Sequence, residues 1–223
     1  MNSYKYVILD MGNVLVGPPT GEWLITSTFL KFVDKDKVDI EKYRSVKKEI
    51  QHIIDRKAET LSEEYDIFIE FYTKLISGMG LDINEEQIKE IVDDFVFNKH
   101  DDKYYLYDDV KEELERLSNK YTLLLLSDNW PCAIDYLKET NIYDYFKKVY
   151  ISSIYGVRKS DEILFDYPIK EFNIKDGEAL FVDDNSDLLD IAEDKNLNVL
   201  LMDRYNKVED SKFSVIHELS EIV

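Results

Sequence analysis

The chain has 223 residues, enough for one core with an inserted smaller domain, and its 44% hydrophobic content allows a sizeable buried core. A formal net charge of −19 argues against nucleic-acid partners and anionic membrane surfaces, because both require a surplus of Lys and Arg. Cys132 is the only cysteine, so no intramolecular disulfide can form. The apolar run near the N-terminus is too short for a signal peptide, and we therefore expect a cytoplasmic protein.

The first expected element is a strand over Tyr6–Leu9, a short apolar run with little polar alternation. Such runs are typical of strands buried on both faces of a parallel sheet. Asp10 follows the strand directly, and a turn containing Gly12 comes next. Because open α/β sheets build their sites at the carboxyl ends of parallel strands, Asp10 is a candidate site residue. Capping of its own loop is the alternative interpretation.

The segment from about Glu22 to His100 contains no convincing strand, and its apolar residues recur at helical spacing. We predict a bundle of about four helices there, inserted between the first strand and the rest of the sheet. Gly78 and Gly80 are interpreted as helix ends within this bundle. The expected domains are a core of residues 1–17 and 103–223 and a helical insert of residues 18–102.

After the insert, strands and helices alternate along the chain, which predicts right-handed βαβ crossovers and a parallel sheet. The expected elements are a helix over Asp108–Asn119, a strand over Leu123–Leu126, a helix over Cys132–Glu139, strands over Lys148–Ser152 and Ala179–Val182, a helix over Asp187–Lys195 and a strand over Asn198–Met202. The predicted fold class is α/β, with a doubly wound, Rossmann-like parallel sheet and an inserted helical domain.

Paired acids follow the predicted Ala179–Val182 strand. Asp183 and Asp184 are adjacent, and carboxylates at a buried strand end repel each other unless a cation compensates. Mg²⁺ is the expected cation, held by Asp10, Asp184 and the Gly12 carbonyl, with Asp183 as a further candidate ligand. Helix capping explains one of the two acids but not both.

Ser127, Asp128 and Asn129 follow the predicted Leu123–Leu126 strand, where a hydroxyl and a backbone N–H can hold a phosphoryl oxygen. These three are candidate substrate-binding residues, with a helix cap as the alternative.

Lys159 lies in a turn of a chain that is short of cations. An ammonium there can neutralise a phosphate and an attacking carboxylate together, although a solvated surface position is the usual explanation of a single Lys.

In this order the segments resemble the four motifs of the haloacid dehalogenase-like hydrolase superfamily. The matching segments are Val7-Ile8-Leu9-Asp10 for the strand that ends in a nucleophilic Asp, Leu126-Ser127 for the strand that ends in Ser or Thr, Gly156–Asp161 for the segment that carries the Lys, and Val182-Asp183-Asp184 for the paired acids. The resemblance spans Tyr6 to about Arg204. It implies a doubly wound core with a mobile helical cap inserted after the first motif.

The resemblance also implies a magnesium-dependent phosphatase that acts on a small phosphorylated metabolite. Asp10 would attack phosphorus and form an aspartyl-phosphate, Ser127 would orient the phosphoryl group, and Lys159 would offset its charge. Gly12 departs from the family, because most family phosphatases carry an acid–base Asp at that position; the Asp-x-Gly-Asn-Val pattern does resemble a branch that includes bacterial sugar-phosphate phosphatases. Ser160 replaces the usual Pro and should loosen the loop that carries Lys159.

Three other functions are compatible with these motifs. A 2-haloacid dehalogenase also lacks the second motif-one Asp, but it needs no metal and its motif four is rich in Ser, so Asp183 and Asp184 favour phosphate chemistry. A non-catalytic binding or regulatory protein with this fold is favoured by Gly12 alone. A phosphotransferase such as a sugar-phosphate mutase is expected to keep the second acid. The sequence indicates neither the particular substrate nor the oligomeric state.

Overall fold

The computed structural model describes residues 4–34, 36 and 38–223. A parallel sheet of six strands has the order β5-β4-β1-β6-β7-β8. Its strands are β1 (Tyr6–Leu9), β4 (Thr122–Ser127), β5 (Phe146–Ile151), β6 (Ala179–Asp183), β7 (Asn198–Met202) and β8 (Val215–Ile216). The five predicted strands are all present. The one expected at Lys148–Ser152 begins earlier, at Phe146, and ends at Ile151 because Ser152 begins a short helix, α8 (Ser152–Tyr155).

Helices cover both faces of this sheet. The helices α6 (Val110–Ser118) and α7 (Cys132–Glu139) pack on one face, and α9 (Ile163–Glu171) and α10 (Ser186–Asp194) pack on the other. Leu123 and Leu125 point into the first of these cores, and Leu124 and Leu126 point into the second, because successive side chains of a strand alternate between faces. An unbroken run of leucines therefore suits β4, and the predicted doubly wound α/β fold is confirmed.

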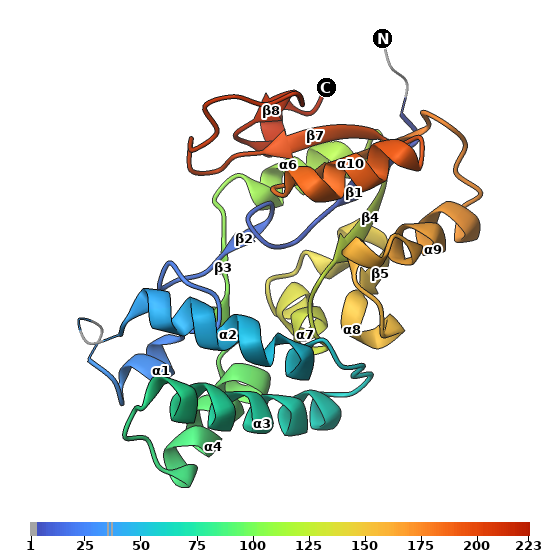
Figure 1. The fold of residues 1–223 in the computed structure, drawn as a ribbon. Helices are drawn as coiled ribbons and strands as arrows, with labels where there is room; N and C mark the ends of the chain where they lie inside the picture. The colour runs from blue at the N-terminus through green and yellow to red at the C-terminus, as the bar shows by residue number, and fades with distance from the viewer. Residues whose placement is uncertain (1–3, 35, 37) are drawn as a thin grey trace.

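The segment between β2 (Val16–Gly17) and β3 (Tyr105–Leu106), called the helical insert below, folds around an apolar core of its own. Its helices are α1 (Ser27–Leu30), α2 (Ile40–Ile54), α3 (Leu61–Met79), α4 (Glu85–Asp93), a π-helical turn (Asp94–Asn98) and α5 (His100–Lys103). Figure 1 shows the helical insert set to one side of the sheet and connected to it through the antiparallel β2–β3 pair. The boundaries expected at residues 17/18 and 102/103 stay a prediction.

Gly78 does not end a helix, contrary to the sequence-based interpretation, because α3 continues through it to Met79. A Cβ built on Gly78 would lie only 2.6 Å from Val46 Cγ1 of α2, so this glycine allows α2 and α3 to approach closely. Gly80 does end α3, with a φ of +71° in the left-handed region. Thr60 and Glu63 form the capping box that begins the same helix.

The strand order places three strand ends together. From the central β1 the chain builds β4 and β5 on one side, then crosses to build β6, β7 and β8 on the other. The carboxyl ends of β1, β4 and β6 therefore lie side by side where the strand order reverses, which is where open α/β sheets bind ligands.

The remaining short elements are 3₁₀ turns at Tyr143–Tyr145, Lys159–Asp161 and Leu219–Glu221. In the described part of the chain, every helix is too short or too polar to cross a bilayer.

Candidate active site

Asp10 is held at the carboxyl end of β1 by the turn that follows it. Its N–H donates to the Val182 carbonyl oxygen at 3.0 Å, which extends the pairing of β1 with β6. The chain reverses at Asn13, whose φ of +52° lies in the left-handed region that Asn tolerates, and the Asn13 N–H donates to the Val16 carbonyl at 2.7 Å. Asp10 is 6% exposed, so its carboxylate is held in a nearly buried position at the carboxyl end of the sheet.

An acidic cluster at the carboxyl ends of β1 and β6 consists of Asp10, Asp183 and Asp184. Carboxylate oxygens of the three residues all lie within 4.8 Å of one another. Asp183, the last residue of β6, is buried, whereas Asp184 lies at the exposed rim. Asn13 Nδ2 donates to Asp184 Oδ2 at 2.8 Å and holds that rim carboxylate in place. The predicted convergence of the first and last motifs is therefore what the structure shows.

Lys159 enters the acidic cluster from the 3₁₀ turn Lys159–Asp161. Its Nζ lies 2.9 Å from Asp10 Oδ1 and 2.5 Å from Asp183 Oδ2, and the residue is 2% exposed. Its backbone N–H donates to Asp128 Oδ1 at 3.0 Å, which fixes the turn against the end of β4. Burial by itself would lower the pKa of this ammonium, but the charges of Asp10 and Asp183 outweigh burial and raise it.

The acids of the cluster are harder to ionise than ordinary aspartates. Burial raises the pKa of Asp10 to about 6, because the attraction of Lys159 only partly offsets lost hydration and Asp183 adds repulsion. Burial also raises the pKa of Asp183. Desolvation and the Asp10 charge raise the pKa of Asp184, although its side chain still reaches solvent. The cluster thus holds more negative charge than Lys159 neutralises.

The composition of the acidic cluster fits a divalent cation. Three ionised carboxylates against one ammonium leave a net charge of −2 (three minus one). Asp10 Oδ1 is buried and, although it is close to Lys159 Nζ, no hydrogen bond is aligned on it. Mg²⁺ prefers carboxylate and carbonyl oxygens and keeps several waters, so a cluster with few ligands and an exposed rim suits it. Gly12, whose carbonyl is the remaining predicted ligand, lies with the three carboxylates in the wall of one cavity, described below.

Ser127, Asp128 and Asn129 lie at the end of β4, as predicted, and two of them already have protein partners. Asp128 receives the backbone N–H of the 3₁₀ turn, and its Oδ2 lies 3.5 Å from Arg158 Nε. Asn129 Oδ1 accepts the Tyr104 hydroxyl at 2.6 Å. Asp128 and Asn129 therefore brace neighbouring loops, while Ser127, which is 2% exposed, lines a cavity next to the acidic cluster.

A cavity of about 430 Å³ lies between the acidic cluster and the helical insert. That volume is in the range of pockets that bind small molecules. Its walls include every residue that the sequence predicted to be catalytic, substrate-binding or metal-binding: Asp10, Gly12, Ser127, Asp128, Asn129, Lys159, Asp183 and Asp184. Residues from four segments that are far apart in the chain thus meet around one space.

The helical insert contributes wall residues that sequence reasoning missed. Trp23 lies over Gly12, since a Cβ built on that glycine would lie 3.5 Å from Trp23 Cζ2. Lys47 and Gln51 line the cavity from α2. Their spacing marks one face of a helix, but a solvated helix face has the same spacing, so the pattern alone could not separate the two.

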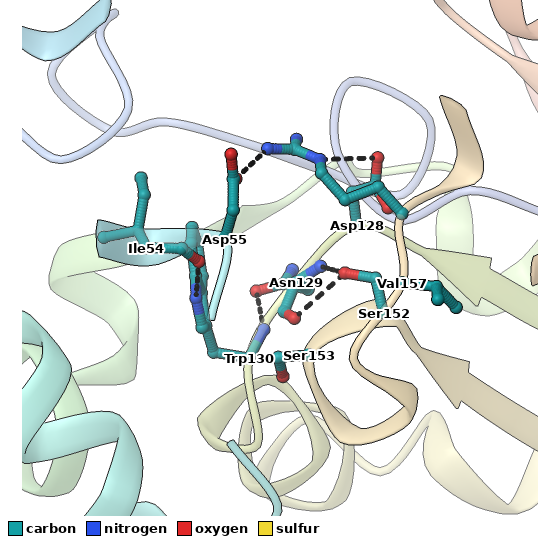
Figure 2. A pocket seen from close by; sticks show the side chains of 9 residues that line it. Ile54, Asp55, Asp128, Asn129, Trp130, Ser152, Ser153 and Val157 are labelled. Atoms are coloured by element: carbon teal, nitrogen blue, oxygen red, sulfur yellow. Dashed lines mark hydrogen bonds and ion pairs between the residues drawn. The ribbon is translucent and has the colours of Figure 1, made fainter. Parts of the chain in front are cut away.

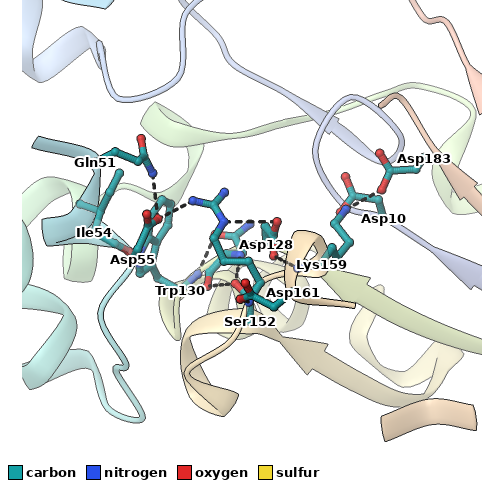
Figure 3. A network of polar contacts seen from close by, with 12 residues as sticks. Asp10, Gln51, Ile54, Asp55, Asp128, Trp130, Ser152, Lys159, Asp161 and Asp183 are labelled. Carbon is teal, nitrogen blue, oxygen red and sulfur yellow. Dashed lines mark hydrogen bonds and ion pairs between the residues drawn. The ribbon is translucent and has the colours of Figure 1, made fainter. Parts of the chain in front are cut away.

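Contacts between the end of α2 and the core surround a second, smaller pocket, which shares Ile54, Asp128 and Trp130 with the cavity (Figure 2). Trp130 Nε1 donates to the Ile54 carbonyl at 3.1 Å, and Arg158 forms an ion pair with Asp55 while also approaching Asp128. In Figure 3 these polar contacts lie on one side and the Lys159 ion pairs lie on the other. Any movement of the helical insert away from the core would have to break the Trp130 and Arg158 contacts.

Comparison with known proteins agrees with this geometry. A family model of haloacid dehalogenase-like hydrolases matches residues 4–192. A HAD family enzyme from Bacteroides thetaiotaomicron is 18% identical, with a TM-score of 0.66 over 92% of this chain and 96% of that chain. A HAD hydrolase from Bacillus subtilis bound to magnesium is 13% identical, with a TM-score of 0.70 over 98% of this chain and 96% of that chain. The L-2-haloacid dehalogenase of Xanthobacter autotrophicus is 14% identical, with a TM-score of 0.71 over 98% of this chain and 96% of that chain. Such identities show a common fold, and no curated protein matched.

Proposed function

Because the chain belongs to the haloacid dehalogenase-like hydrolase family, we propose that it is a magnesium-dependent phosphatase of small phosphate monoesters, with sugar phosphates as one candidate class. The observation that carries this proposal is the acidic cluster, in which Lys159 is the only cation of the described residues that pairs with Asp10, Asp183 or Asp184. A divalent metal would remove the remaining net charge of −2 (three carboxylates minus one ammonium) and leave the site able to accept a phosphate ester.

In the proposed reaction Asp10 is the nucleophile. One of its carboxylate oxygens forms a bond to phosphorus, the bond between phosphorus and the ester oxygen breaks, and the alcohol leaves. Water then attacks phosphorus in the aspartyl-phosphate, inorganic phosphate leaves, and the Asp10 carboxylate is regenerated. The position of Asp10 in the wall of the cavity, with a buried Oδ1 next to Lys159, supports this role.

Positive charge and hydrogen bonds around Asp10 would stabilise the transferring phosphoryl group. Bound Mg²⁺, held by Asp10, Asp184 and the Gly12 carbonyl, would supply positive charge to the phosphoryl oxygens. Lys159 would add a second positive charge, oriented by its ion pair with Asp183, the remaining candidate metal ligand. Ser127 would donate its hydroxyl hydrogen to a phosphoryl oxygen.

The proton for the leaving alcohol has no donor at Gly12. A Cβ at that position would lie 3.5 Å from Trp23 Cζ2, an ordinary van der Waals contact, so the Trp23 ring borders the space without filling the Cβ position. General acid–base help is typically worth about 10²–10⁴-fold in rate. We therefore expect turnover to favour esters whose alcohol leaves as a stable anion.

The helical insert would act as a cap over the reaction. It supplies Trp23, Lys47 and Gln51 to the cavity wall, and its closure would exclude water and select the substrate. The cytoplasmic location and the absence of nucleic-acid or membrane partners stay predictions from composition and charge.

A 2-haloacid dehalogenase is the second candidate, in which Asp10 would attack carbon. Its support is the shared fold with the Xanthobacter enzyme, at 14% identity. The uncompensated negative charge of the acidic cluster favours a metal, and with it phosphate chemistry, over this reaction. A non-catalytic protein of this fold is favoured only by the missing acid at Gly12.

Hydrolysis of p-nitrophenyl phosphate with and without Mg²⁺ tests the proposal, because this ester has a good leaving group and needs little acid catalysis. We expect magnesium-dependent hydrolysis by the wild type, abolished in Asp10→Asn and retained in Asp176→Asn, a change at an exposed position away from the cavity. Equal inertness of the wild type and Asp10→Asn towards this ester and other small phosphate esters would refute the phosphatase. Chloride release from 2-chloropropionate without magnesium would establish the dehalogenase instead.

A further inference from the structure

We propose that Lys47 forms a subsite for a second anionic group on the substrate, so that the enzyme prefers phosphate esters with an additional negative charge remote from the scissile ester. This inference rests on the proposed phosphatase function and names the class of substrate that the cavity selects. It adds a specificity-determining residue on the helical insert to the reaction centre on the sheet.

The face of α2 that meets the cavity carries Lys47. Residues 47, 51 and 54 line the cavity together, and this i, i+4, i+7 spacing is one face of a helix. Figure 3 shows Gln51 and Ile54 on the opposite side of the view from Asp10, Asp183 and Lys159. A substrate whose phosphoryl group is at Asp10 would therefore extend towards α2, and Lys47 is the cationic residue on that face.

The other cations of the cavity wall have protein partners. Lys159 is paired with two aspartates of the acidic cluster, and Arg158 is paired with Asp55. Lys103 Nζ lies 3.7 Å from Glu64 Oε1 and 3.7 Å from the centre of the Phe95 ring. Lys47 has neither an ion pair nor a hydrogen bond within the part of the chain that the structure describes, so its charge is available to a ligand.

Lys47 is also poorly solvated for a helix-surface lysine. Its side chain is half-buried, and burial lowers its pKa although the charge of Glu22 opposes this shift. Glu22 is engaged elsewhere, since Arg44 Nη2 lies 2.6 Å from its Oε1. A partly desolvated ammonium without a counter-ion gains more from an anionic ligand than a hydrated one does.

Size and charge agree with a substrate of this kind. A cavity of about 430 Å³ holds a phosphoryl group together with a carbon skeleton and a second polar group. The chain carries a net charge of −19, which repels anions in general. A local cation at the far wall is therefore the feature that could select a doubly anionic substrate over a singly anionic one.

A series of matched esters tests the subsite. Ethyl, propyl and butyl phosphates are compared with their ω-carboxylated counterparts and with the corresponding alkanediol bisphosphates, and p-nitrophenyl phosphate is the reference in every assay. We expect the wild type to prefer one anionic length over its uncharged analogue by about 10–100-fold in kcat/KM, the range of a charge-assisted contact. Preference for carboxylate or for phosphate at that length identifies the second group.

Lys47→Met should reduce that preference by at least about 10-fold, and Lys47→Arg should restore most of it. Lys48→Met is the matched control, because it removes the same charge from the adjacent, exposed position of α2, and it should keep the wild-type preference. If p-nitrophenyl phosphate is hydrolysed but no anionic ester is preferred, or if Lys47→Met retains the preference, the subsite is refuted while the phosphatase stands. If no phosphate ester is hydrolysed, the phosphatase itself is refuted and the subsite with it.

Discussion

Replacing Lys159 with methionine should make the stability of the protein depend on magnesium and on pH. The ammonium faces Asp10 at 2.9 Å and Asp183 at 2.5 Å, both nearly buried. Methionine keeps most of the side-chain length but leaves these carboxylates without a counter-ion. Breaking a buried ion pair by removing one partner costs about 3–5 kcal/mol, so we expect a loss of that size in metal-free protein at pH 8.

The loss should shrink as the pH falls. In the wild type the folded-state pKa of Asp10 is already raised to about 6, so protonation of this group stabilises the folded protein at low pH. Without Lys159 the folded-state pKa values of the acids rise further above their unfolded values. A carboxyl with a raised folded pKa destabilises the protein progressively as the pH rises through the interval between the two values, which for Asp10 begins at about pH 4 and ends above the wild-type folded value of about 6.

Urea unfolding of Lys159→Met and wild type measures the loss of stability. Measurements at pH 5 and pH 8, in EDTA and in millimolar Mg²⁺, give its dependence on pH and on magnesium. Mg²⁺ should recover part of the loss at pH 8, because a bound cation offsets the same carboxylates. Lys148→Met is the control: Lys148 is exposed on β5 and pairs with Glu171 at 3.4 Å, so its loss should be within about 0.5 kcal/mol. A Lys159→Met protein as stable as the wild type at pH 8 in EDTA, or a loss that is the same at both pH values, would refute the charge balance drawn for the cluster.

Three further outcomes follow from particular contacts. The rise in Tm caused by Mg²⁺ should shrink below about pH 6, where protons compete for Asp10; a pH-independent rise would contradict its role as a ligand. Gly12→Asp, whose Cβ would make only an ordinary contact with the Trp23 ring, should raise kcat/KM for alkyl phosphates relative to p-nitrophenyl phosphate by up to about 10²-fold; an unchanged ratio would contradict the missing acid–base group. Gly78→Ala should lower the free energy of unfolding by about 1–2 kcal/mol through its clash with Val46, yet raise it by up to about 1 kcal/mol in a Val46→Ala background; urea unfolding that shows the same sign in both backgrounds would refute this packing.

The sheet could be predicted from the sequence because its inner strands are buried on both faces. β1 and β7 have the predicted bounds, and β4 differs by one residue at each end. The β2–β3 pair and β8 were not predicted, since two-residue strands have no periodicity to detect. The helix α9 was missed as well, and Pro168 within it is a residue that normally argues against a helix interior.

The candidate site was predictable wherever chemistry is concentrated at a strand end. Asp10, Ser127 and the acids after β6 follow apolar runs directly, so their convergence follows from the parallel topology. The wall supplied by the helical insert was not predictable. Lys47 differs from Lys48 only in the direction of its side chain, and that direction depends on how α2 packs against α3 and the core.

The chemical nature of the intermediate tests the central claim most directly. The wild type is mixed with p-nitrophenyl phosphate and Mg²⁺ in ¹⁸O-labelled water, quenched in acid during a single turnover, and digested for mass spectrometry of the peptide that contains Asp10. We predict one phosphoryl group on Asp10 during turnover, ¹⁸O in the released phosphate, and unlabelled Asp10 carboxylate afterwards, because water attacks phosphorus. Turnover without a phosphoryl group on Asp10 would contradict the account.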